Sequence, residues 1–249
     1  MASNPFDLSS LGVNLAKPTP PTTKHSMLLY GRMRTGKSTL AASAAEVDGM
    51  WPILWIAAED GTTSFAGKYD DRIDVVKPGS WSDIQNVVET LVDNETKYKT
   101  VVVDTLVESQ EFIRKEYLAA SGGKGDYAMW DKVAEGVIWL SKTLHNSQYN
   151  FIGITHHEKT KDDVAGNVLI SPLFQGKKAL ANVPKVYDTI AYLAKGEDDE
   201  GEPVRKLVLT ALDNVDAGSR LEHILPPGFI NPTMSKFMEP IFQEAAKNE

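Results

Sequence analysis

The segment Gly-Arg-Met-Arg-Thr-Gly-Lys-Ser at residues 31–38 constrains this chain more than any other feature of its sequence. It matches the pattern Gly-x-x-x-x-Gly-Lys-Ser/Thr at every fixed position, after an apolar run at 27–30 and before a helical pattern at 40–45. A glycine-containing turn between a strand and a helix directs backbone N–H groups toward a phosphate, and its glycines permit close approach. We therefore predict a nucleotide site at Gly31, Arg32, Met33, Arg34, Thr35, Gly36, Lys37, Ser38 and Thr39.

The lysine and the hydroxyl of such a loop have defined tasks. The lysine neutralises the β- and γ-phosphate oxygens, and the hydroxyl ligates Mg²⁺. We assign these tasks to Lys37 and Ser38, and we expect ATP and Mg²⁺ as cofactors. Asp104 ends the β-branched run 100–104, from where a carboxylate can reach the same ion through water. The alternative for Asp104 is an aspartate that caps the turn after a strand.

Short apolar runs alternate with helical patterns over most of the chain. Such alternation indicates βαβ units, and hence an α/β fold with a mostly parallel central sheet flanked by helices. Two late runs joined by an acidic turn predict an antiparallel hairpin at the sheet edge. The expected strands lie at 27–30, 53–57, 73–76, 100–104, 151–155, 189–193 and 206–212, and the longer helices lie at 82–93 and 128–146.

The remaining segments predict one domain with flexible ends. Residues 1–24 include Lys-Pro-Thr-Pro-Pro and have few periodic apolar positions, which is typical of an extended tail. Residues 25–235 contain all of the expected strands and form the core. Residues 236–249 are expected to be a C-terminal tail or a short helix.

The composition excludes several classes of protein. Lys and Arg number 26 and Asp and Glu 34, giving a net charge of −8, so any contact with DNA must come from a local basic patch. The absence of cysteine excludes disulfides, thiolate zinc sites and thiol nucleophiles. No apolar run approaches the roughly 18 residues of a membrane helix, so we expect a soluble protein without a membrane segment.

Two further sites lie just beyond expected strands. Glu59 comes just after the strand at 53–57, where a carboxylate could polarise the water that attacks a γ-phosphate. Asp60 competes for that role, and a solvated acidic turn is the other alternative. His156 and His157 come after the strand at 151–155, where a side chain can sense a γ-phosphate. A strand–loop junction without a specific task remains open for both histidines.

The residues beyond the phosphate loop distinguish the sub-classes of such proteins. Residues 160–163, Thr-Lys-Asp-Asp, fit the guanine-reading string of a GTPase, but they begin too far beyond the strand to serve it. A nucleoside kinase needs an arginine-rich lid, and the arginines of this chain do not cluster outside the phosphate loop. Both sub-classes are therefore disfavoured.

The order of these motifs resembles the RecA-like ATPase core, in particular phage-encoded RecA-like ATPases that include the single-strand annealing ATPases. The resemblance covers residues 26 to about 232 and rests on segments 31–39, 58–61, 101–105, 126–127, 154–159, 173–188 and 217–220. It implies a RecA-like P-loop fold and ATP hydrolysis. It also implies a ring or filament of identical subunits and, for a phage protein, a place in the host cytoplasm.

The resemblance also implies roles for individual residues. Glu59 resembles the glutamate that activates water, and His157 the γ-phosphate sensor, although a shift of one residue would choose His156. Arg220 resembles the arginine of a Lys-x-Arg pair that acts on a neighbouring subunit's nucleotide. Gly218 stands where that pair has its lysine, so the trans-acting role of Arg220 is in doubt.

Single-stranded DNA is the partner that the resemblance implies. Residues 158–176 resemble the DNA-contacting loop of RecA, and residues 121–127 a second mobile loop. The candidate DNA contacts are Lys124, Lys159, Lys161, Lys177 and Lys178. The expected function is ATP-coupled binding of single-stranded DNA in phage recombination, annealing or replication, together with a single-strand binding protein or another phage protein. The first alternative is a nucleotide-dependent adaptor or helicase loader, and the second is a small-molecule kinase.

Overall fold

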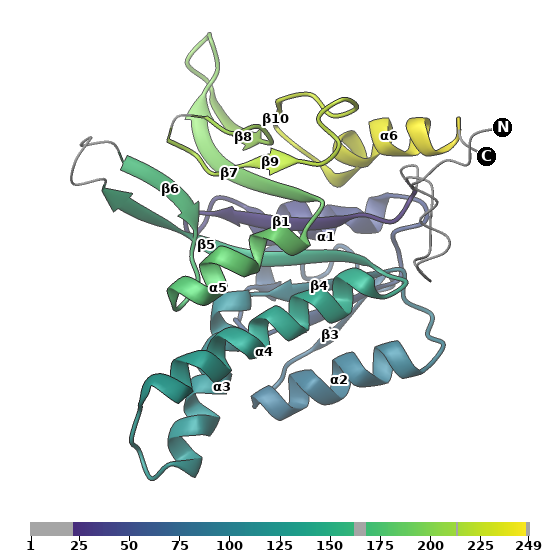
Figure 1. Ribbon diagram of the computed structural model, residues 1–249. Helices are drawn as coiled ribbons and strands as arrows, with labels where there is room; N and C mark the ends of the chain where they lie inside the picture. The colour runs from purple at the N-terminus through teal and green to yellow at the C-terminus, as the bar shows by residue number, and fades with distance from the viewer. Residues whose placement is uncertain (1–21, 162–167, 213, 248–249) are drawn as a thin grey trace, which may run out of the picture.

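A ten-stranded sheet forms the centre of the computed structural model, which describes residues 22–161, 168–212 and 214–247 (Figure 1). The strand order is β10-β8-β7-β1-β5-β4-β2-β3, and β6 and β9 pair with β5 and β7 outside this path. The six strands from β7 to β3 are parallel, whereas β8, β10, β6 and β9 are antiparallel to their neighbours. The strands are β1 (Ser26–Gly31), β2 (Ile53–Ala57), β3 (Ile73–Val76), β4 (Thr100–Asp104), β5 (Asn150–Lys161), β6 (Val168–Pro172), β7 (Thr189–Glu197), β8 (Pro203–Val208), β9 (Gly218–Ser219) and β10 (Gly228–Ile230).

Helices cover both faces of the sheet. Because side chains alternate along a strand, Met27 and Leu29 of β1 join one apolar cluster and Leu28 joins the other. The first cluster includes α1 (Lys37–Ala42) and α6 (Met234–Ala245). The second includes α2 (Trp81–Asp93), α3 (Leu106–Ala120), α4 (Tyr127–Asn146) and α5 (Lys177–Asn182), and single 3₁₀ turns lie at Ser43–Glu46, Thr62–Ser64 and Pro184–Val186. None of the described helices is long and apolar enough to cross a membrane.

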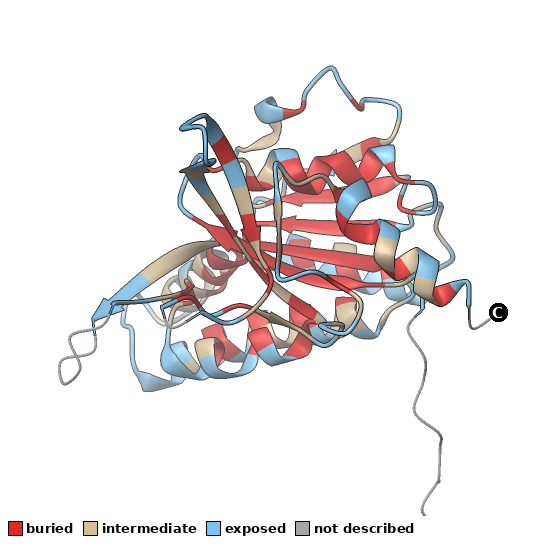
Figure 2. Cartoon of the chain, turned by 90° about the horizontal axis from the view of Figure 1, so that it is seen from above, coloured by how far each residue is buried: buried red, intermediate tan, exposed pale blue. Residues whose placement is uncertain are grey.

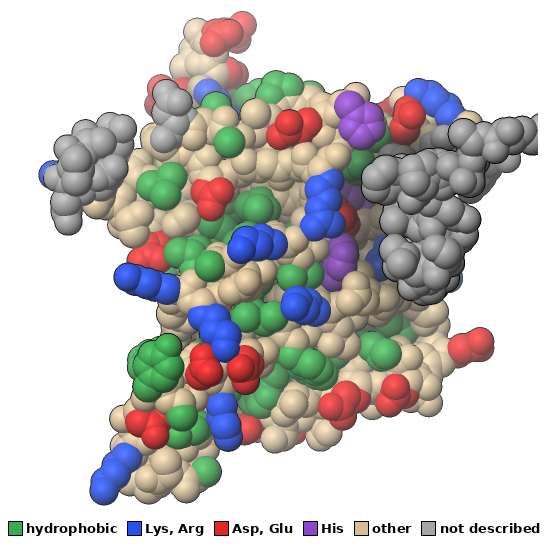
Figure 3. All heavy atoms as spheres, in the orientation of Figure 1, with side chains coloured by type: hydrophobic (Ala, Val, Ile, Leu, Met, Phe, Trp, Pro, Cys, Tyr) green, Lys and Arg blue, Asp and Glu red, His purple; other side chains and the backbone are tan. Residues whose placement is uncertain are grey.

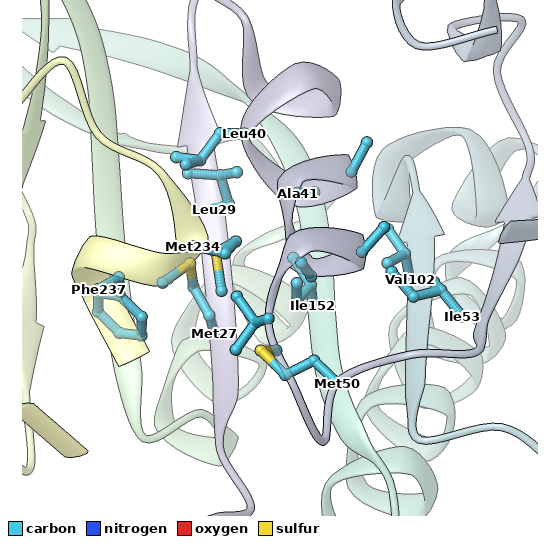
Figure 4. Packing of buried hydrophobic residues seen from close by; sticks show 14 of the residues in the cluster. Met27, Leu29, Leu40, Ala41, Met50, Ile53, Val102, Ile152, Met234 and Phe237 are labelled. Carbon is cyan, nitrogen blue, oxygen red and sulfur yellow. The ribbon is translucent and has the colours of Figure 1, made fainter. Parts of the chain in front are cut away.

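Helix α6 closes one side of the core. Its Met234 and Phe237 are buried and lie beside Met27 and Leu29 of β1, as Figure 4 shows. The helix begins at a capping residue, since the Thr233 hydroxyl accepts the backbone N–H of Lys236. The C-terminal segment of the described chain is therefore part of the packed core.

The predicted α/β class, the mostly parallel sheet and the C-terminal edge hairpin are confirmed. Several elements differ from the expectation, among them the following two. Helix α3 comes directly after β4, where the sequence predicted no helix. Strand β5 continues to Lys161 and pairs with β6, so the described parts of the segment expected as a DNA-contacting loop are mainly a β-ribbon. The middle of that segment, residues 162–167, lies outside the described residues.

The topology brings several strand ends to one edge. Strand β5 lies between β1 and β4, so the segments that come after these three parallel strands meet at their carboxyl ends. This is the edge at which open α/β sheets bind ligands. In Figure 2 the central strands are buried along their length, whereas β5 and β7 become exposed toward their carboxyl ends.

Candidate nucleotide site

The loop between β1 and α1 requires glycine at two positions. A Cβ atom on Gly31 would lie 2.3 Å from the carbonyl oxygen of Leu193, so only glycine allows β1 to pass β7 this closely. Gly36 has a φ of 100°, in the region that favours glycine. The hydroxyl of Thr35 donates to the carbonyl oxygen of Arg32 at 2.9 Å and closes the turn. These three features fix the turn between β1 and α1 in which a phosphate-binding loop is expected.

Lys37 lies buried at the centre of this loop, with 6% of its surface exposed. Its ammonium group donates to the carbonyl oxygens of Gly31 at 3.0 Å and of Arg32 at 3.1 Å. Burial lowers the pKa of Lys37, and the nearby carboxylates of Asp104 and Glu59 oppose this effect. A phosphate would offer the ammonium a full negative charge in place of two neutral carbonyl groups.

Ser38 and Asp104 form a pair of oxygen ligands. The Ser38 hydroxyl donates to Oδ2 of Asp104 at 2.8 Å, and Asp104 is 3% exposed. Burial raises the pKa of Asp104 to about 6, against the opposing hydrogen bond from Ser38. A Cβ atom on Gly61 would lie 3.2 Å from Oδ2 of Asp104 and 3.4 Å from the Ser38 hydroxyl, so the missing side chain leaves room beside this pair.

Ser38 and Asp104 suit Mg²⁺ better than they suit a metal ion that is coordinated by protein side chains alone. Mg²⁺ is usually bound by one or two carboxylates together with phosphate oxygens and waters. Among the described residues, no group of three or more His, Cys, Asp or Glu side chains could hold a metal ion. Ser38 and Asp104 would therefore hold an ion whose other ligands come from a nucleotide and from water.

Glu59 is anchored next to this pair. Its backbone N–H donates to the carbonyl oxygen of Asp104 at 2.9 Å, and its Oε2 lies 3.2 Å from Nε2 of His156. The competing candidate, Asp60, has an 81% exposed side chain that pairs with Lys77 at 3.6 Å. Both carboxylates line the cavity, but the contact with His156 holds that of Glu59.

Most of the residues predicted to bind the nucleotide, hold the metal or catalyse hydrolysis line one cavity of about 500 Å³. It extends from the phosphate loop across the ends of β2, β4 and β5. Of the predicted residues, it is lined by Met33, Arg34, Gly36, Lys37, Ser38, Thr39, Glu59, Asp104 and His156. Phosphate-binding, metal-binding and general-base candidates therefore share one space.

The two histidines lie on opposite faces of β5, since successive side chains of a strand alternate. His156 lines the cavity with Glu59, and its Nδ1 atom is buried without a hydrogen-bond partner among the described residues. His157 points into a second cavity, where its ring stacks on Tyr192 at 6.1 Å. His156 therefore lies beside Glu59 in the nucleotide cavity. His157, which the resemblance favoured as the γ-phosphate sensor, lies in the second cavity.

Arg220 does not join the cavity. Its guanidinium donates to Oδ1 of Asp188 at 3.3 Å and to the carbonyl oxygen of Lys185 at 2.7 Å. Asp188 accepts the backbone N–H of Ser26, at the start of β1, whereas the phosphate loop comes after the end of that strand. Arg220 thus lies at the opposite edge of the sheet from the nucleotide site of its own chain.

The five predicted DNA-contacting lysines lie in three places, on the α3–α4 loop, on α5 and on β5. Lys124 is exposed between α3 and α4, and Lys177 is exposed at the start of α5. Lys178 pairs with Asp131 at 2.8 Å and with Glu135 at 3.0 Å, and basic and acidic side chains are interspersed over this face in Figure 3. Lys161 ends β5, and Lys159 lines the second cavity.

Arg205 is a neighbour of the phosphate loop that the sequence did not indicate. If Gly36 carried a Cβ atom, it would lie 2.8 Å from Nε and 3.0 Å from Cζ of Arg205, so the guanidinium of this β8 residue rests against the phosphate loop. Asn231 fixes the Arg205 backbone with two hydrogen bonds, of 3.0 and 2.7 Å. Among the described residues, no carboxylate pairs with this guanidinium. The approach is purely tertiary, so no local pattern could have revealed it.

Comparisons with known proteins found one family model and several solved structures that are similar to this chain. A family model described as an AAA domain matches residues 23–221. Among solved structures, a KaiC-like protein of the hyperthermophilic archaeon Pyrococcus horikoshii is 15% identical, with 79% of this chain and 82% of that chain covered and a TM-score of 0.45. The RadB recombinase is 15% identical, with 90% of each chain covered and a TM-score of 0.46. A comparison with curated proteins found no match.

Proposed function

We propose, from the premise that this chain belongs to the AAA domain family, that it binds ATP with Mg²⁺ and hydrolyses it in the cavity beside residues 31–39. The observation that carries this proposal is the meeting of four side chains in one cavity. Lys37 supplies the cation, Ser38 and Asp104 the metal ligands, and Glu59 a carboxylate held beside them.

Each of these residues has a task in hydrolysis. Lys37 would exchange two backbone carbonyl groups for the β- and γ-phosphate oxygens. Ser38 and Asp104 would hold Mg²⁺, which supplies neutralisation of the developing phosphate charge. Glu59 would accept a proton from the attacking water, and its hydrogen bond to His156 would orient it. His156, rather than His157, is then the residue placed to respond to the γ-phosphate.

We further propose that this ATPase acts on single-stranded DNA in recombination, annealing or replication, as the resemblance to phage RecA-like ATPases implies. A ring or filament of identical subunits belongs to the same proposal. The competing function is a nucleotide-dependent adaptor for another replication protein. The net charge of −8 favours the adaptor, as does the acidic turn at 197–202 between β7 and β8.

Steady-state ATP hydrolysis with and without single-stranded DNA tests this function. We expect turnover that disappears when EDTA removes Mg²⁺ and that rises when single-stranded DNA is added. Turnover that survives EDTA would contradict the assigned metal ligands. Turnover that requires Mg²⁺ but is unchanged by DNA would support the assigned ATPase site and favour the adaptor function.

Arg205→Ala is expected to weaken the binding of ATP and of ADP to a similar extent, by about tenfold or more. The guanidinium lies against Gly36, in the part of the loop that holds phosphates common to both nucleotides, and a hydrogen bond to a charged group contributes about 1.5–3 kcal/mol. Titration with a fluorescent nucleotide measures the effect.

Two further variants control this measurement. Arg205→Lys is expected to retain part of the affinity, because it keeps the charge but loses the planar fork. Lys206→Ala, a charge change on the same strand, is expected to leave both affinities unaltered. An unchanged dissociation constant for Arg205→Ala would show that this guanidinium does not contact the nucleotide.

A further inference from the structure

Two β-ribbons extend beyond the carboxyl edge of the parallel sheet. One is formed by β5 and β6 and the other by β7 and β8, and Figure 1 shows them diverging from each other. A second cavity, of about 430 Å³, has walls from both ribbons and a floor from the phosphate loop. We name it the ribbon cleft, and its lining includes Arg32, Thr35, His157, Lys159, Tyr192 and Lys195.

The ribbon cleft is basic in a chain that is acidic overall. Of the described residues, Arg32, Lys159 and Lys195 contribute charged side chains to its lining, and no described Asp or Glu does. All three cations are exposed, and none of them pairs with a carboxylate among the described residues. Lys195 also lies directly opposite Arg205 in the β7–β8 register. Like charges at facing positions destabilise a ribbon, and a bound anion would relieve this repulsion.

Two stacked rings in the ribbon cleft, His157 of β5 and Tyr192 of β7, bring the two ribbons together. The ring centroids of His157 and Tyr192 lie 6.1 Å apart with an angle of 17° between the planes. Burial lowers the pKa of His157, and the positive charges of Lys159, Lys37 and Arg32 act in the same direction. These effects favour the uncharged imidazole, which is a flat and partly buried surface in the same cleft as the three cations.

We propose that the ribbon cleft binds single-stranded DNA, with Arg32, Lys159 and Lys195 at the phosphates and the His157–Tyr192 pair beneath a base. This proposal rests on the proposed DNA-dependent ATPase and gives it a binding site. Cations along a groove with an aromatic platform are the combination by which proteins bind single strands without reading their sequence. A duplex, with its bases already stacked inside, would not use the aromatic surface.

The surroundings of the ribbon cleft limit the path of the strand. The turn that joins β7 to β8 carries Glu197, Asp198, Asp199, Glu200 and Glu202, all exposed and all beyond Lys195 along the ribbon. These carboxylates repel the phosphate backbone of DNA. The bound DNA strand is therefore expected to cross the base of the two ribbons, next to the phosphate loop. The other predicted DNA contacts, Lys124, Lys161, Lys177 and Lys178, are not in the lining of this cleft.

Fluorescence anisotropy with a labelled oligothymidine of about 20 nucleotides, longer than the usual site of roughly 4–16 nucleotides, tests the proposal. The double variant Lys159→Gln/Lys195→Gln is expected to bind about tenfold more weakly. The slope of log affinity against log salt concentration is expected to be shallower by about 1.4, because two phosphate contacts are lost. Lys99→Gln/Lys142→Gln removes the same charge from exposed lysines outside the cleft and is the matched control. It is expected to bind like the unaltered protein.

The contribution of the His157–Tyr192 pair to DNA affinity is tested separately from that of the charges. Tyr192→Leu is expected to weaken binding about tenfold with an unaltered salt dependence, because stacking involves no release of counterions. Tyr192→Phe retains the ring and is expected to retain the affinity. Thermal unfolding of each variant identifies any loss that comes from misfolding.

Three results would overturn the proposal, and ATP hydrolysis measured on the same preparations separates them from a failure of the ATPase. In the first, the protein binds the oligonucleotide and the cleft double variant matches its control, so the strand binds elsewhere. In the second, the protein hydrolyses ATP and binds no oligonucleotide even at low salt, which favours the adaptor. In the third, the cleft variants dissociate an oligomer while DNA affinity is unchanged, so the cleft is a contact between subunits.

Discussion

Lys37→Ala is expected to abolish ATP binding within the concentration range of a titration. The ammonium of Lys37 is buried at the centre of the phosphate loop, where no solvent shell can replace it. Removing one partner of a buried charge pair costs about 3–5 kcal/mol, which is a loss of more than about a hundredfold in affinity. Isothermal titration calorimetry with ATP and Mg²⁺ measures this effect directly.

The fold itself should tolerate this change. Among the described residues, Lys37 donates only to carbonyl groups of its own loop, and burial already penalises its charge. We therefore expect a melting temperature close to that of the unaltered protein. Lys68→Ala, which removes a surface lysine that pairs with Glu46, serves as the control. Strong ATP binding by Lys37→Ala would overturn the assignment of the site.

Glu59→Gln is expected to separate binding from hydrolysis. Glutamine has the same shape and can keep the contact with His156, while the backbone hydrogen bond to Asp104 does not involve the side chain. The variant loses the carboxylate that accepts a proton from water, and general-base catalysis contributes about 10²–10⁴-fold. We expect ATP affinity within a few-fold of normal, and turnover lower by about that factor.

Asp60→Asn is the matched control for this result. Asp60 is the adjacent carboxylate, it lines the same cavity, and its side chain pairs with Lys77 near solvent. Single-turnover hydrolysis compares the two variants without interference from product release. Normal turnover in Glu59→Gln together with slow turnover in Asp60→Asn would transfer the general-base role to Asp60.

The part of the site that the sequence predicted depends on strand ends. Runs of β-branched residues identified β4, and its last residue is Asp104. Glu59 comes after β2 in the same way, and parallel neighbours end at a common edge. Because a phosphate loop also comes after a strand of this sheet, local patterns were enough to bring Lys37, Ser38, Asp104 and Glu59 together.

The elements that the sequence did not predict depend on tertiary contacts. Helix α3 buries Gln110, a polar residue that obscures an apolar pattern and is satisfied by the backbone of Gln175 through bonds of 3.0 and 2.8 Å. The outer part of β5 has both faces near solvent, so its polar sequence is also typical of a loop. The choice between His156 and His157 depended on the strand register, which local residues do not fix.

The close passage of Gly31 by Leu193 has a mechanical consequence. Because the backbones of β1 and β7 touch at this point, the start of the phosphate loop cannot shift without moving the base of the β7–β8 ribbon. The β7–β8 ribbon therefore contacts the phosphate loop near its base, and the rest of the ribbon extends away from the sheet. A displacement of the ribbon base would therefore also displace the start of the phosphate loop.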